Sequence, residues 1–501
     1  MVSDLKLSVK PGASSLLTRV SQFLNKKGIK SYLIGGFVRD MLLGRDTADI
    51  DIALVADALE VAPKVAKALG GRYVLLDEVN RIGRVVLVNE DAPIGGKWEL
   101  DFSTIEDNIA QDLARRDFTI DAMAIELEKV TESPMLIDPF KGYADLRRGI
   151  IRAVAETAFT SDPARLLRAV RLAAELDFRI EGKTEALIRR HSHLIAGVAG
   201  ERVREELLRL LALLQSGKLL AYLDEVGLLT SIFPELLETK GVEQPREHVW
   251  DVFHHSIETV AAVDFLLRQG DWKYAGDEVL AVVPWSTELE QHFDREVSYG
   301  STRKLLLKLA ALLHDIAKPQ TKTVEESGRT RFLGHAKEGM TIATDILERL
   351  RFSTKEIKLV ELMVKYHLRP TQMSHDELPS RRAIYRYFRD TGETGIDILF
   401  LSLADHLASR GQYLDLTQWR AHAQLVAYVL EQHDAEASLM VPPKLVDGHD
   451  LIGIFGLSPG PKIGEILETV REAQAAGEVT TREEALAYIE HLLASSKDKR
   501  F

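Results

Sequence analysis

The chain has no cysteine among its 501 residues, which excludes disulfides and cysteine-ligated zinc. It also lacks any run of about 18 apolar residues, the length that a membrane-spanning helix needs. The opening segment "MVSDLKLSVKPGASSLLTRV" lacks the basic-then-apolar order of a signal peptide. The chain has no excess of positive charge, since its net charge is −12. This argues against a protein coated in positive charge for non-specific binding of nucleic acid. We therefore expect a soluble, cytoplasmic protein with no membrane partner.

The length and the local charge say what is present. A chain of 501 residues is too long for one ordinary core, and about 150 residues per domain predicts three or four domains. Between Arg147 and Leu210 there are 13 Lys or Arg and 9 Asp or Glu, a net charge of +4, so the other residues together carry −16. A local basic surface is therefore predicted within an acidic chain.

The pattern of apolar residues divides the chain into two parts. Alternation predicts strands at residues 32–34, 49–55, 72–76, 84–88 and 98–102, and a helix at 57–70. After about residue 145 the apolar residues recur with the helical period, as in "ARLLRAVRLAAEL" and "VREELLRLLALL". We predict an α/β head followed by a mostly α-helical body. Residues 268–302 interrupt the helical pattern and predict an insertion or long loop, to which we assign no chemistry.

The segment "LIGGFVRDMLLGRDTADIDIALV" places six charged side chains in an otherwise apolar stretch. In a strand, Asp49 and Asp51 point to one face. Two neighbouring carboxylates repel each other unless a cation lies between them, and magnesium suits oxygen ligands and assists phosphoryl transfer. Gly35 and Gly36 allow the backbone to approach a triphosphate, and Arg39 is available as a phosphate partner. This segment predicts a nucleotide-and-metal site.

Either feature alone is common, because Asp-x-Asp is usually surface decoration and Gly-Gly usually a turn. Two further elements support the site. The predicted strand "WELDFS" carries Asp101 as a possible third carboxylate, and in "DLARRDFTIDAMA" Arg115, Arg116 and Asp117 precede an apolar run. The combination favours a catalytic site over a chance pattern.

Five motifs in fixed order resemble the class II tRNA nucleotidyltransferase and poly(A) polymerase family: "GGFVRD", "DIDIA", "RRDFTIDAMA", "DPFKGYADLRRGIIR" and "SDPARLLRAVRLAAEL". The resemblance covers roughly residues 30–215. It implies a polymerase-β-like head (residues 1–146), a helical neck with a base- and RNA-binding surface (147–244), and transfer of nucleotides from CTP, and from ATP, to a tRNA 3′ end without a template.

The resemblance also implies roles for single residues. Asp49, Asp51 and Asp101 are the predicted catalytic carboxylates, and Asp49 and Asp51 are the predicted magnesium ligands. The predicted nucleotide-binding residues are Gly35, Gly36, Arg39, Arg116, Asp117, Asp162, Arg165, Arg168 and Arg171.

The base-reading element is predicted in "SDPARLLRAVR". Asp162 and Arg165, three apart on a helix, share a face, and Arg168 and Arg171 continue roughly along it. A carboxylate accepts from an exocyclic amino group and a guanidinium donates to ring acceptors, as reading cytosine or adenine requires. The alternative is an ordinary salt-bridged helix face.

Three features depart from the family pattern. Ser161 stands where a glutamate is usual, and Asp121 where an asparagine is usual. The link over residues 102–114 is shorter than the family's flexible segment, with Glu106 near the position of an arginine. From the short link we expect a preference for CTP over ATP, with full CCA addition as the rival.

Downstream, an ordered series of His and Asp residues resembles the HD phosphohydrolase superfamily over about residues 245–410. Such ligands suit a divalent ion, here manganese, nickel, cobalt or magnesium, that activates water against a phosphate ester. The alternative is a metal site kept only as scaffold. The series consists of His255, His314, Asp315 and Asp405 as metal ligands, and His335 and His367 as accessory residues.

The remaining histidines, which include His191, His193, His248 and His254, are predicted to be surface or packing residues. Residues 411–501 form a predicted helical tail, in which "GLSPGPKIG" places a turn before a helix start. The free amides there could hold a tRNA phosphate, or the turn is a plain one.

Three other functions compete with tRNA extension. They are a phosphohydrolase whose head only captures RNA or nucleotide, a non-catalytic RNA-binding protein, and a poly(A) polymerase. A binding head need not keep three carboxylates aimed at one point, which favours the transferase. The acidic net charge and the lack of a basic tail argue against poly(A) polymerase, because a processive hold on RNA needs backbone charge neutralisation.

Overall fold

The structure is a computed structural model that describes residues 11–88, 92, 96–130, 134–373, 378–435 and 444–497. It divides into two compact units, residues 1–198 with 223–232, and residues 199–222 with 233–501. None of the described helices combines the length and apolar character needed to cross a bilayer.

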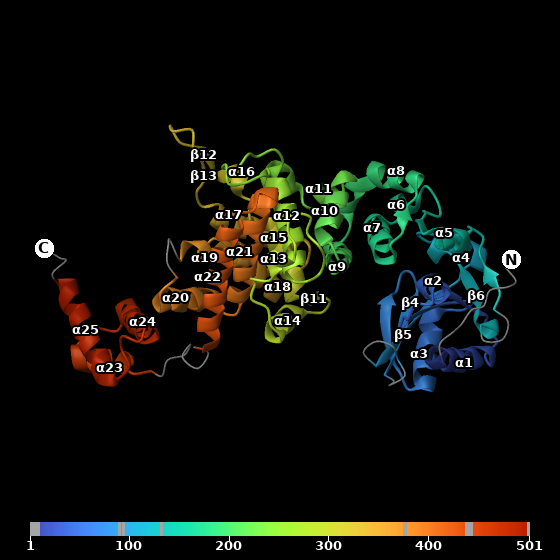
Figure 1. The fold of residues 1–501 in the computed structure, drawn as a ribbon. Helices are drawn as coiled ribbons and strands as arrows, with labels where there is room; N and C mark the ends of the chain where they lie inside the picture. Colours follow the sequence, from blue (N-terminus) through green and yellow to red (C-terminus); the bar gives the residue numbers. More distant parts are fainter. Residues whose placement is uncertain are drawn as a thin grey trace. The chain divides into compact units, whose positions relative to one another are not determined.

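The head is built on a seven-stranded sheet of order β3-β4-β5-β2-β1-β6-β7 (Figure 1). Strand β2 pairs in parallel with β5, while the other neighbouring strands are antiparallel. The α/β head predicted from the sequence is confirmed, with each predicted strand present. The strands are β1 (Ser31–Ile34), β2 (Asp49–Leu54), β3 (Arg72–Asp77), β4 (Ile82–Val88), β5 (Lys97–Thr104), β6 (Ala124–Glu126) and β7 (Leu136–Ile137).

Helices pack against this sheet and then continue into the neck. The predicted helix at 57–70 is α3, which begins after Asp57, whose side chain accepts a hydrogen bond from the amide of Leu59 at 3.0 Å. The helices of this unit are α1 (Pro11–Asn25), α2 (Gly35–Leu43), α3 (Ala58–Leu69), α4 (Ile109–Ala114), α5 (Gly142–Arg148), α6 (Ala158–Ser161), α7 (Arg165–Leu176), α8 (Gly182–His191) and α11 (Leu229–Ile232). The short strands β8 (Ile150–Ile151) and β9 (Arg179–Ile180) pair in parallel beside them.

The second unit is helical, as predicted. Helices α12, α15, α18 and α21 pack on one another and form its centre (Figure 1). Its helices are α9 (Gly200–Leu211), α12 (Val252–Leu266), α13 (Asp277–Leu280), α14 (Thr287–Asp294), α15 (Arg303–Leu313), α16 (Lys318–Thr321), α17 (His335–Arg349), α18 (Thr354–Tyr366), α19 (Arg369–Gln372), α20 (Arg381–Thr391), α21 (Thr394–Arg410) and α22 (Leu416–Ala435). Helix α10 (Ser216–Glu225) connects the chain across the boundary of the units.

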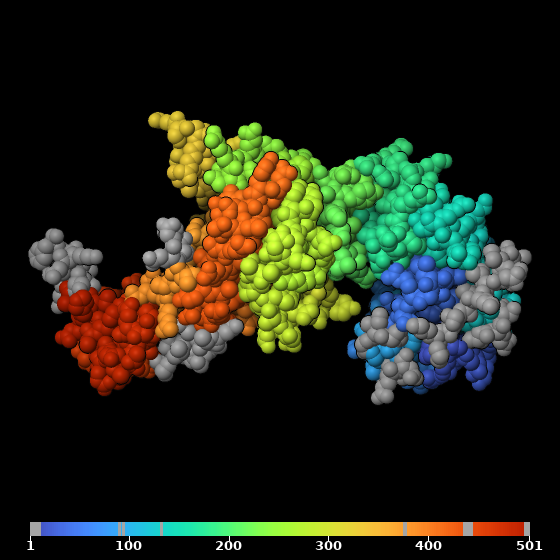
Figure 2. All heavy atoms as spheres, in the orientation of Figure 1, coloured from blue at the N-terminus to red at the C-terminus, as the bar shows by residue number. Residues whose placement is uncertain are grey.

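The predicted insertion at residues 268–302 is not a structureless loop. It contains α13, α14 and a hairpin of β10 (Glu296–Ser298) and β11 (Ser301–Thr302). A second hairpin, β12 (Lys322–Val324) with β13 (Thr330–Phe332), stands out from the surface of this unit (Figure 2).

The last helices have a small apolar core of their own. They are α23 (Gly448–Phe455), α24 (Pro461–Ala475) and α25 (Arg482–Lys497). The predicted turn before a helix start is present, because Gly456 ends α23 at φ +66° and α24 begins at Pro461. The core consists of Val446, Leu451, Ile466, Val470, Ala473, Val479, Ala485 and Ile489.

Candidate active sites

The carboxylates of the head lie on one face of the sheet. In the parallel pair of β2 and β5, Asp49 stands opposite Glu99 and Asp51 opposite Asp101. Alternate residues of a strand share a face, so all four carboxylates point the same way. Ile50 between the two aspartates is 1% exposed, which fixes the orientation of β2. The alternation read from "DIDIA" is therefore present in the structure.

Arg84 on β4 binds the third carboxylate. Its Nε and Nη2 donate to the two oxygens of Asp101 at 2.7 and 2.9 Å, and its Nη1 donates to Glu99. The Nζ of Lys97 lies 3.0 Å from the other oxygen of Glu99. Sequence reasoning missed Arg84 and Glu99. The available signal was strand alternation, since Glu99 precedes Asp101 by two residues on the same predicted strand.

The end of β1 meets Asp51 closely. Gly35 has φ +67°, and a Cβ atom added there would lie 2.8 Å from Asp51 Oδ2 and 2.8 Å from Arg116 Nη1. Only glycine satisfies both the backbone angle and this close approach. Burial raises the pKa of Asp51 to about 6, while nearby Arg116 acts to lower it and Asp101 to raise it. A divalent cation beside Asp51 would keep this carboxylate ionised, so the residues fit a magnesium site.

Arg39 lies deeper than a surface phosphate ligand. It is 7% exposed, its Nε and Nη2 donate to Asp40 at 2.9 Å each, and its Nη1 donates to Asp121 at 2.8 Å. Asp121, where the family usually has an asparagine, is thus a second carboxylate partner of Arg39, beside Asp40. The contact of Arg39 with a triphosphate stays a prediction.

Arg168 links two other carboxylates of this region. Its Nε donates to Asp117 at 2.6 Å, and its Nη2 lies 3.6 Å from Asp121. Arg171, which was predicted to continue the same face, is 6% exposed and donates to Glu175 at 2.6 Å. The structure therefore joins Arg168 to the predicted nucleotide site through Asp117, whereas Arg171 pairs with Glu175 of its own helix.

Asp162 does not lie on the helix of Arg165. Its backbone is extended (φ −148°, ψ 97°), because Pro163 disfavours the helical conformation of the residue before it. The carboxylate of Asp162 accepts from the amide of Ala164 at 3.2 Å and lies 3.8 Å from Arg165 Nε. The prediction of one helix face was wrong, although the two side chains are still neighbours.

The predicted HD residues converge from five helices. His255 comes from α12, His314 and Asp315 follow α15, His335 begins α17, His367 follows α18 and Asp405 lies in α21. We call these six residues the HD centre. Its shortest contacts are His255 Nε2 to Asp405 Oδ1 at 3.0 Å, His314 Nε2 to Asp315 Oδ2 at 3.1 Å, and His335 Nε2 to Asp315 Oδ1 at 3.3 Å.

Hydrogen bonds to the backbone define which ring nitrogen of three histidines faces the centre. The Nδ1 atoms of His314, His335 and His367 contact carbonyl oxygens three residues earlier, at 2.9, 2.7 and 2.7 Å. A carbonyl only accepts, so each Nδ1 carries a proton and each Nε2 faces the centre, where it offers a lone pair when the ring is neutral. His335 Nε2 and His367 Nε2 lie 3.3 Å apart. Lone pairs that face each other and a carboxylate need a cation between them, which fits a metal centre.

Lys318 lies next to the HD centre. Its Nζ lies 2.6 Å from Asp315 Oδ2 and donates to Gln244 at 2.6 Å. Burial would raise the pKa of Asp315, but His314 and Lys318 hold it well below its usual range. Burial lowers the pKa of His367 to about 3, so this ring is neutral at physiological pH. Both residues are thus in the protonation states of metal ligands.

Three groups of side chains place ligand atoms within 4.8 Å of one another, and all of them lie in the helical unit. Among the described residues, the head carboxylates form no such group. In the head, both oxygens of Asp101 accept hydrogen bonds from Arg84 of β4. The three groups are His248 with His255 and Asp405, His255 with His314 and Asp315, and Asp315 with His335 and His367.

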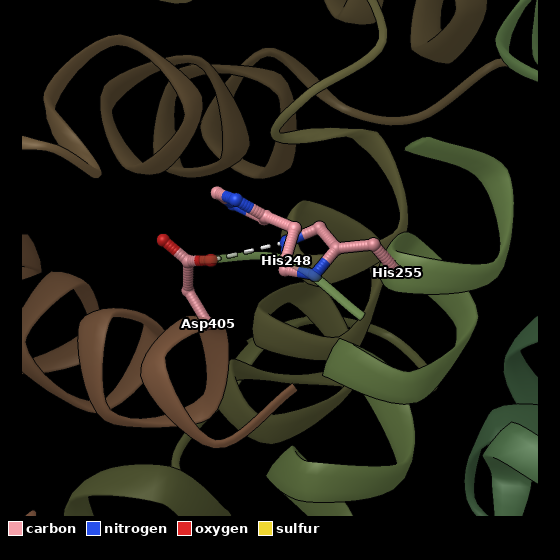
Figure 3. A group of neighbouring side chains, drawn as sticks. All are labelled: His248, His255 and Asp405. Carbon is pink, nitrogen blue, oxygen red and sulfur yellow. Dashed lines mark ion pairs between the residues drawn. The ribbon is translucent and has the colours of Figure 1, made fainter. Parts of the chain in front are cut away.

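His248 was predicted to be a surface or packing residue, and the structure places it beside two of the predicted metal ligands. It lies with His255 and Asp405 (Figure 3). Burial, and next the charge of His255, lower the pKa of His248 to about 3. His254, by contrast, has a side chain 62% exposed whose Nδ1 lies 2.7 Å from Asp251. Sequence spacing missed His248 because it precedes α12 in an irregular segment.

Family models match both the head and the HD region of the chain. Residues 31–152 match the "Poly A polymerase head domain" model, 177–239 the "Probable RNA and SrmB-binding site of polymerase A" model, and 276–410 the "HD domain" model. The chain is 34% identical to the A-adding tRNA nucleotidyltransferase of Deinococcus radiodurans, over 91% of this chain and 94% of the relative. It is 32% identical to the CC-adding tRNA nucleotidyltransferase of Thermus thermophilus, over 92% and 93%.

Solved structures share the fold. The CCA-adding enzyme of Thermotoga maritima complexed with tRNA has a TM-score of 0.57 at 23% identity, covering 97% of this chain and 96% of that one. A CCA-adding enzyme complexed with CTP has a TM-score of 0.62 at 24% identity, with the same coverage. Fold and matches together define a polymerase-type head joined to a helical body with an HD domain. The chain belongs to the tRNA nucleotidyltransferase family, which confirms the resemblance seen in the sequence.

Proposed function

We propose that the chain adds nucleotides, without a template, to the 3′ end of tRNA in the synthesis or repair of its CCA end. CTP is the proposed nucleotide donor, with ATP as a second one, and the cytoplasm is the proposed location. The observation that carries this proposal is the single face of β2 and β5 on which Asp49, Asp51 and Asp101 lie. Relatives named for tRNA nucleotide addition support it.

The proposed division of labour follows the domains predicted from the sequence. The head (residues 1–146) carries the transfer chemistry, and the neck (147–244) carries the base-reading and RNA-binding surface. The HD domain (245–410) holds the second metal site. The tail (411–501) is a proposed contact for tRNA.

Asp49 and Asp51 are the proposed ligands of magnesium, which when bound clamps the attacking and leaving oxygens of phosphoryl transfer. Gly35 lets the backbone at the start of α2 come close to Asp51 and Arg116, and so to the phosphates. Arg116 supplies positive charge there, and Asp117, held by Arg168 at 2.6 Å, is oriented toward the ribose.

Asp162 and Arg165 form the proposed base pocket. The 3.8 Å between Asp162 Oδ2 and Arg165 Nε puts an acceptor and a donor side by side, and Arg165 Nη2 donates to the carbonyl of Arg115 at 2.9 Å. This second bond fixes the guanidinium. Cytosine offers an amino donor and ring acceptors that such a pair can satisfy.

The link before Arg115 supports a preference for CTP. Residues 109–114 form α4, whose first turn is capped by Asn108, and Glu106 pairs with Arg115 at 3.3 Å. A capped helix in this link is less free to move than a flexible segment, and recentring the pocket on adenine would leave polar groups poorly paired, at about 1–3 kcal/mol each. We therefore propose CC addition, with full CCA addition and addition of A alone as rivals.

The test is to give purified protein tRNAs that end at the discriminator base, after one C, or after both, each with CTP, ATP or the two together. Products are separated at single-nucleotide resolution. Arrest after the second C with both nucleotides present supports CC addition. If the tRNA that ends at the discriminator base is extended through both C residues to the terminal A, full CCA addition is supported. If the A is added only to the tRNA that already ends in both C residues, addition of A alone is supported.

A second proposed activity is metal-dependent hydrolysis of small phosphate esters, such as 2′,3′-cyclic nucleotides, at the HD centre. The observation in its favour is the set of Nε2 lone pairs that face Asp315. Manganese, nickel, cobalt or magnesium is the proposed ion. Wild-type protein loaded with each metal is assayed against a His314→Ala variant. Equal hydrolysis by the two proteins would favour the alternative, in which the metal site serves only as a scaffold.

A further inference from the structure

His248 lies outside the ordered His and Asp series, in the irregular segment at residues 244–250 that precedes α12. Hydrogen bonds fasten one end of this segment to the residues that follow Asp315. The side chain of Gln244 accepts from Lys318 Nζ at 2.6 Å and donates to the carbonyl of Trp250 at 3.2 Å. Lys318 is itself 2.6 Å from Asp315.

The other end of the segment is fastened to the residues that follow Asp405. The amide of Val249 donates to the carbonyl of Ser409 at 3.0 Å, and Arg410 donates to the carbonyl of Glu247 at 2.8 Å. The hydroxyl of Ser409 in turn donates to Asp405 at 3.3 Å. The backbone on both sides of His248 is therefore held by residues next to two proposed metal ligands.

The ring of His248 faces the same point as its neighbours (Figure 3). Ligand atoms of His248, His255 and Asp405 lie within 4.8 Å of one another, and the rings of the two histidines stand at 75° with their centroids 5.2 Å apart. His255 is 0% exposed; its Nε2 lies 3.0 Å from Asp405 Oδ1, and its Nδ1 makes no hydrogen bond within the described residues. The Nδ1 of His248 is buried and likewise makes no hydrogen bond in the described part of the chain.

We propose that His248 is a ligand of the divalent cation held by His255 and Asp405, so that the metal site takes a ligand from outside the six residues of the HD centre. The inference rests on the proposed metal binding of the HD centre but not on its turnover. Two imidazoles and one carboxylate form a ligand set that favours a transition-type ion over magnesium. The cation at this position is therefore of the cobalt, nickel or manganese class.

The test uses the full chain, freed of metal with a chelator and titrated with Co²⁺, with binding followed by calorimetry and by the visible absorption of the bound ion. His248→Ala is compared with two other variants. His254→Ala is the matched control, because His254 is adjacent to His255 but exposed, and His255→Ala removes a ligand of the centre.

One bound Co²⁺ should be lost in His255→Ala. We expect His248→Ala to weaken the binding of this ion by at least ~10- to 100-fold, which is the cost of losing an outer-shell partner, and to change its absorption spectrum. His254→Ala should match the wild-type protein. His248→Gln, which keeps the size of the side chain, is measured as well and serves alone if the alanine variant does not fold.

Unchanged affinity and spectrum in the His248 variants, with the equivalent still lost in His255→Ala, would overturn the role of His248 alone. If the wild-type protein binds no Co²⁺ beyond what His255→Ala binds, the proposed metal centre is overturned, and the inference about His248 with it.

Discussion

Arg84 and Asp101 form a bidentate ion pair at the centre of the head, with nitrogen–oxygen distances of 2.7 and 2.9 Å. They come from neighbouring antiparallel strands, in which the two residues stand directly opposite each other. Asp101 in turn stands opposite Asp51. Arg84 therefore fixes the third carboxylate and supplies positive charge beside the proposed magnesium ligands.

Replacement of Arg84 tests this role. Arg84→Gln should lower the single-turnover rate of nucleotide addition by about 10- to 100-fold, because a misplaced carboxylate disturbs a site that depends on position. Arg84→Lys keeps the charge but not the forked guanidinium, so its rate should lie between the rates of Arg84→Gln and the wild type. Arg81→Gln is the control, since Arg81 pairs with Asp57 at the surface of the same unit. Wild-type rates in Arg84→Gln would contradict the prediction.

The contact between Gly35 and Asp51 can be tested with the two glycines at the ends of α2, Gly35 at its start and Gly44 just after its last residue. Gly35→Ala and Gly44→Ala both place a Cβ at a positive φ, at +67° and +70°. Both substitutions should therefore cost about 1 kcal/mol of folding stability. At Gly35 the new atom would also meet Asp51 and Arg116 at 2.8 Å, whereas at Gly44 no described atom lies within 4 Å.

We expect Gly35→Ala to lose most nucleotide addition and Gly44→Ala to retain it. Thermal unfolding measures the loss of folding stability that both variants share. Gel analysis of extended tRNA measures the loss of nucleotide addition that we expect only at Gly35. Equal activity in the two variants would show that the close approach at Gly35 has no part in the reaction.

The pKa of Asp51 predicts a pH dependence for magnesium. Because burial raises this pKa to about 6, the carboxyl is protonated below that value and ionised above it. Magnesium binds the ionised form, so the magnesium concentration that gives half-maximal addition should be constant above about pH 7 and rise about tenfold per pH unit below about pH 6. Magnesium titrations between about pH 5 and 8 measure it. A requirement that does not change over this range would refute the prediction.

The two sites should fail independently. Asp49→Ala or Asp51→Ala should abolish nucleotide addition and leave metal-dependent hydrolysis of phosphate esters intact, because neither side chain belongs to the HD centre. His314→Ala or Asp315→Ala should do the reverse. Each variant is assayed for both activities, and its unfolding is compared with that of the wild-type protein. Loss of both activities in one correctly folded variant would speak against two separate sites.

Much of the fold and of the sites followed from local sequence pattern. The alternation of Asp49, Ile50 and Asp51 predicted one polar and one apolar strand face, since side-chain direction in a strand is set by the backbone itself. The order of the HD residues predicted a shared centre, and all six side chains converge there. Family resemblance supplied the remaining roles, which stay predictions until the variants above are measured.

One miss was readable in the sequence. The extended backbone of Asp162 is imposed by Pro163, so the pairing of Asp162 with Arg165 across a turn, and not along a helix, follows from a local rule.

What the sequence by itself determined is the polar and apolar faces of its strands and helices, and the order in which possible ligands occur. Only the tertiary structure decided which of these residues meet. Arg84 reaches Asp101 because β4 lies beside β5, and His248 reaches Asp405 because its segment is tied to Ser409 and Lys318. Such neighbours are far apart along the chain, and strand pairing and long-range hydrogen bonds, which no local pattern encodes, bring them together.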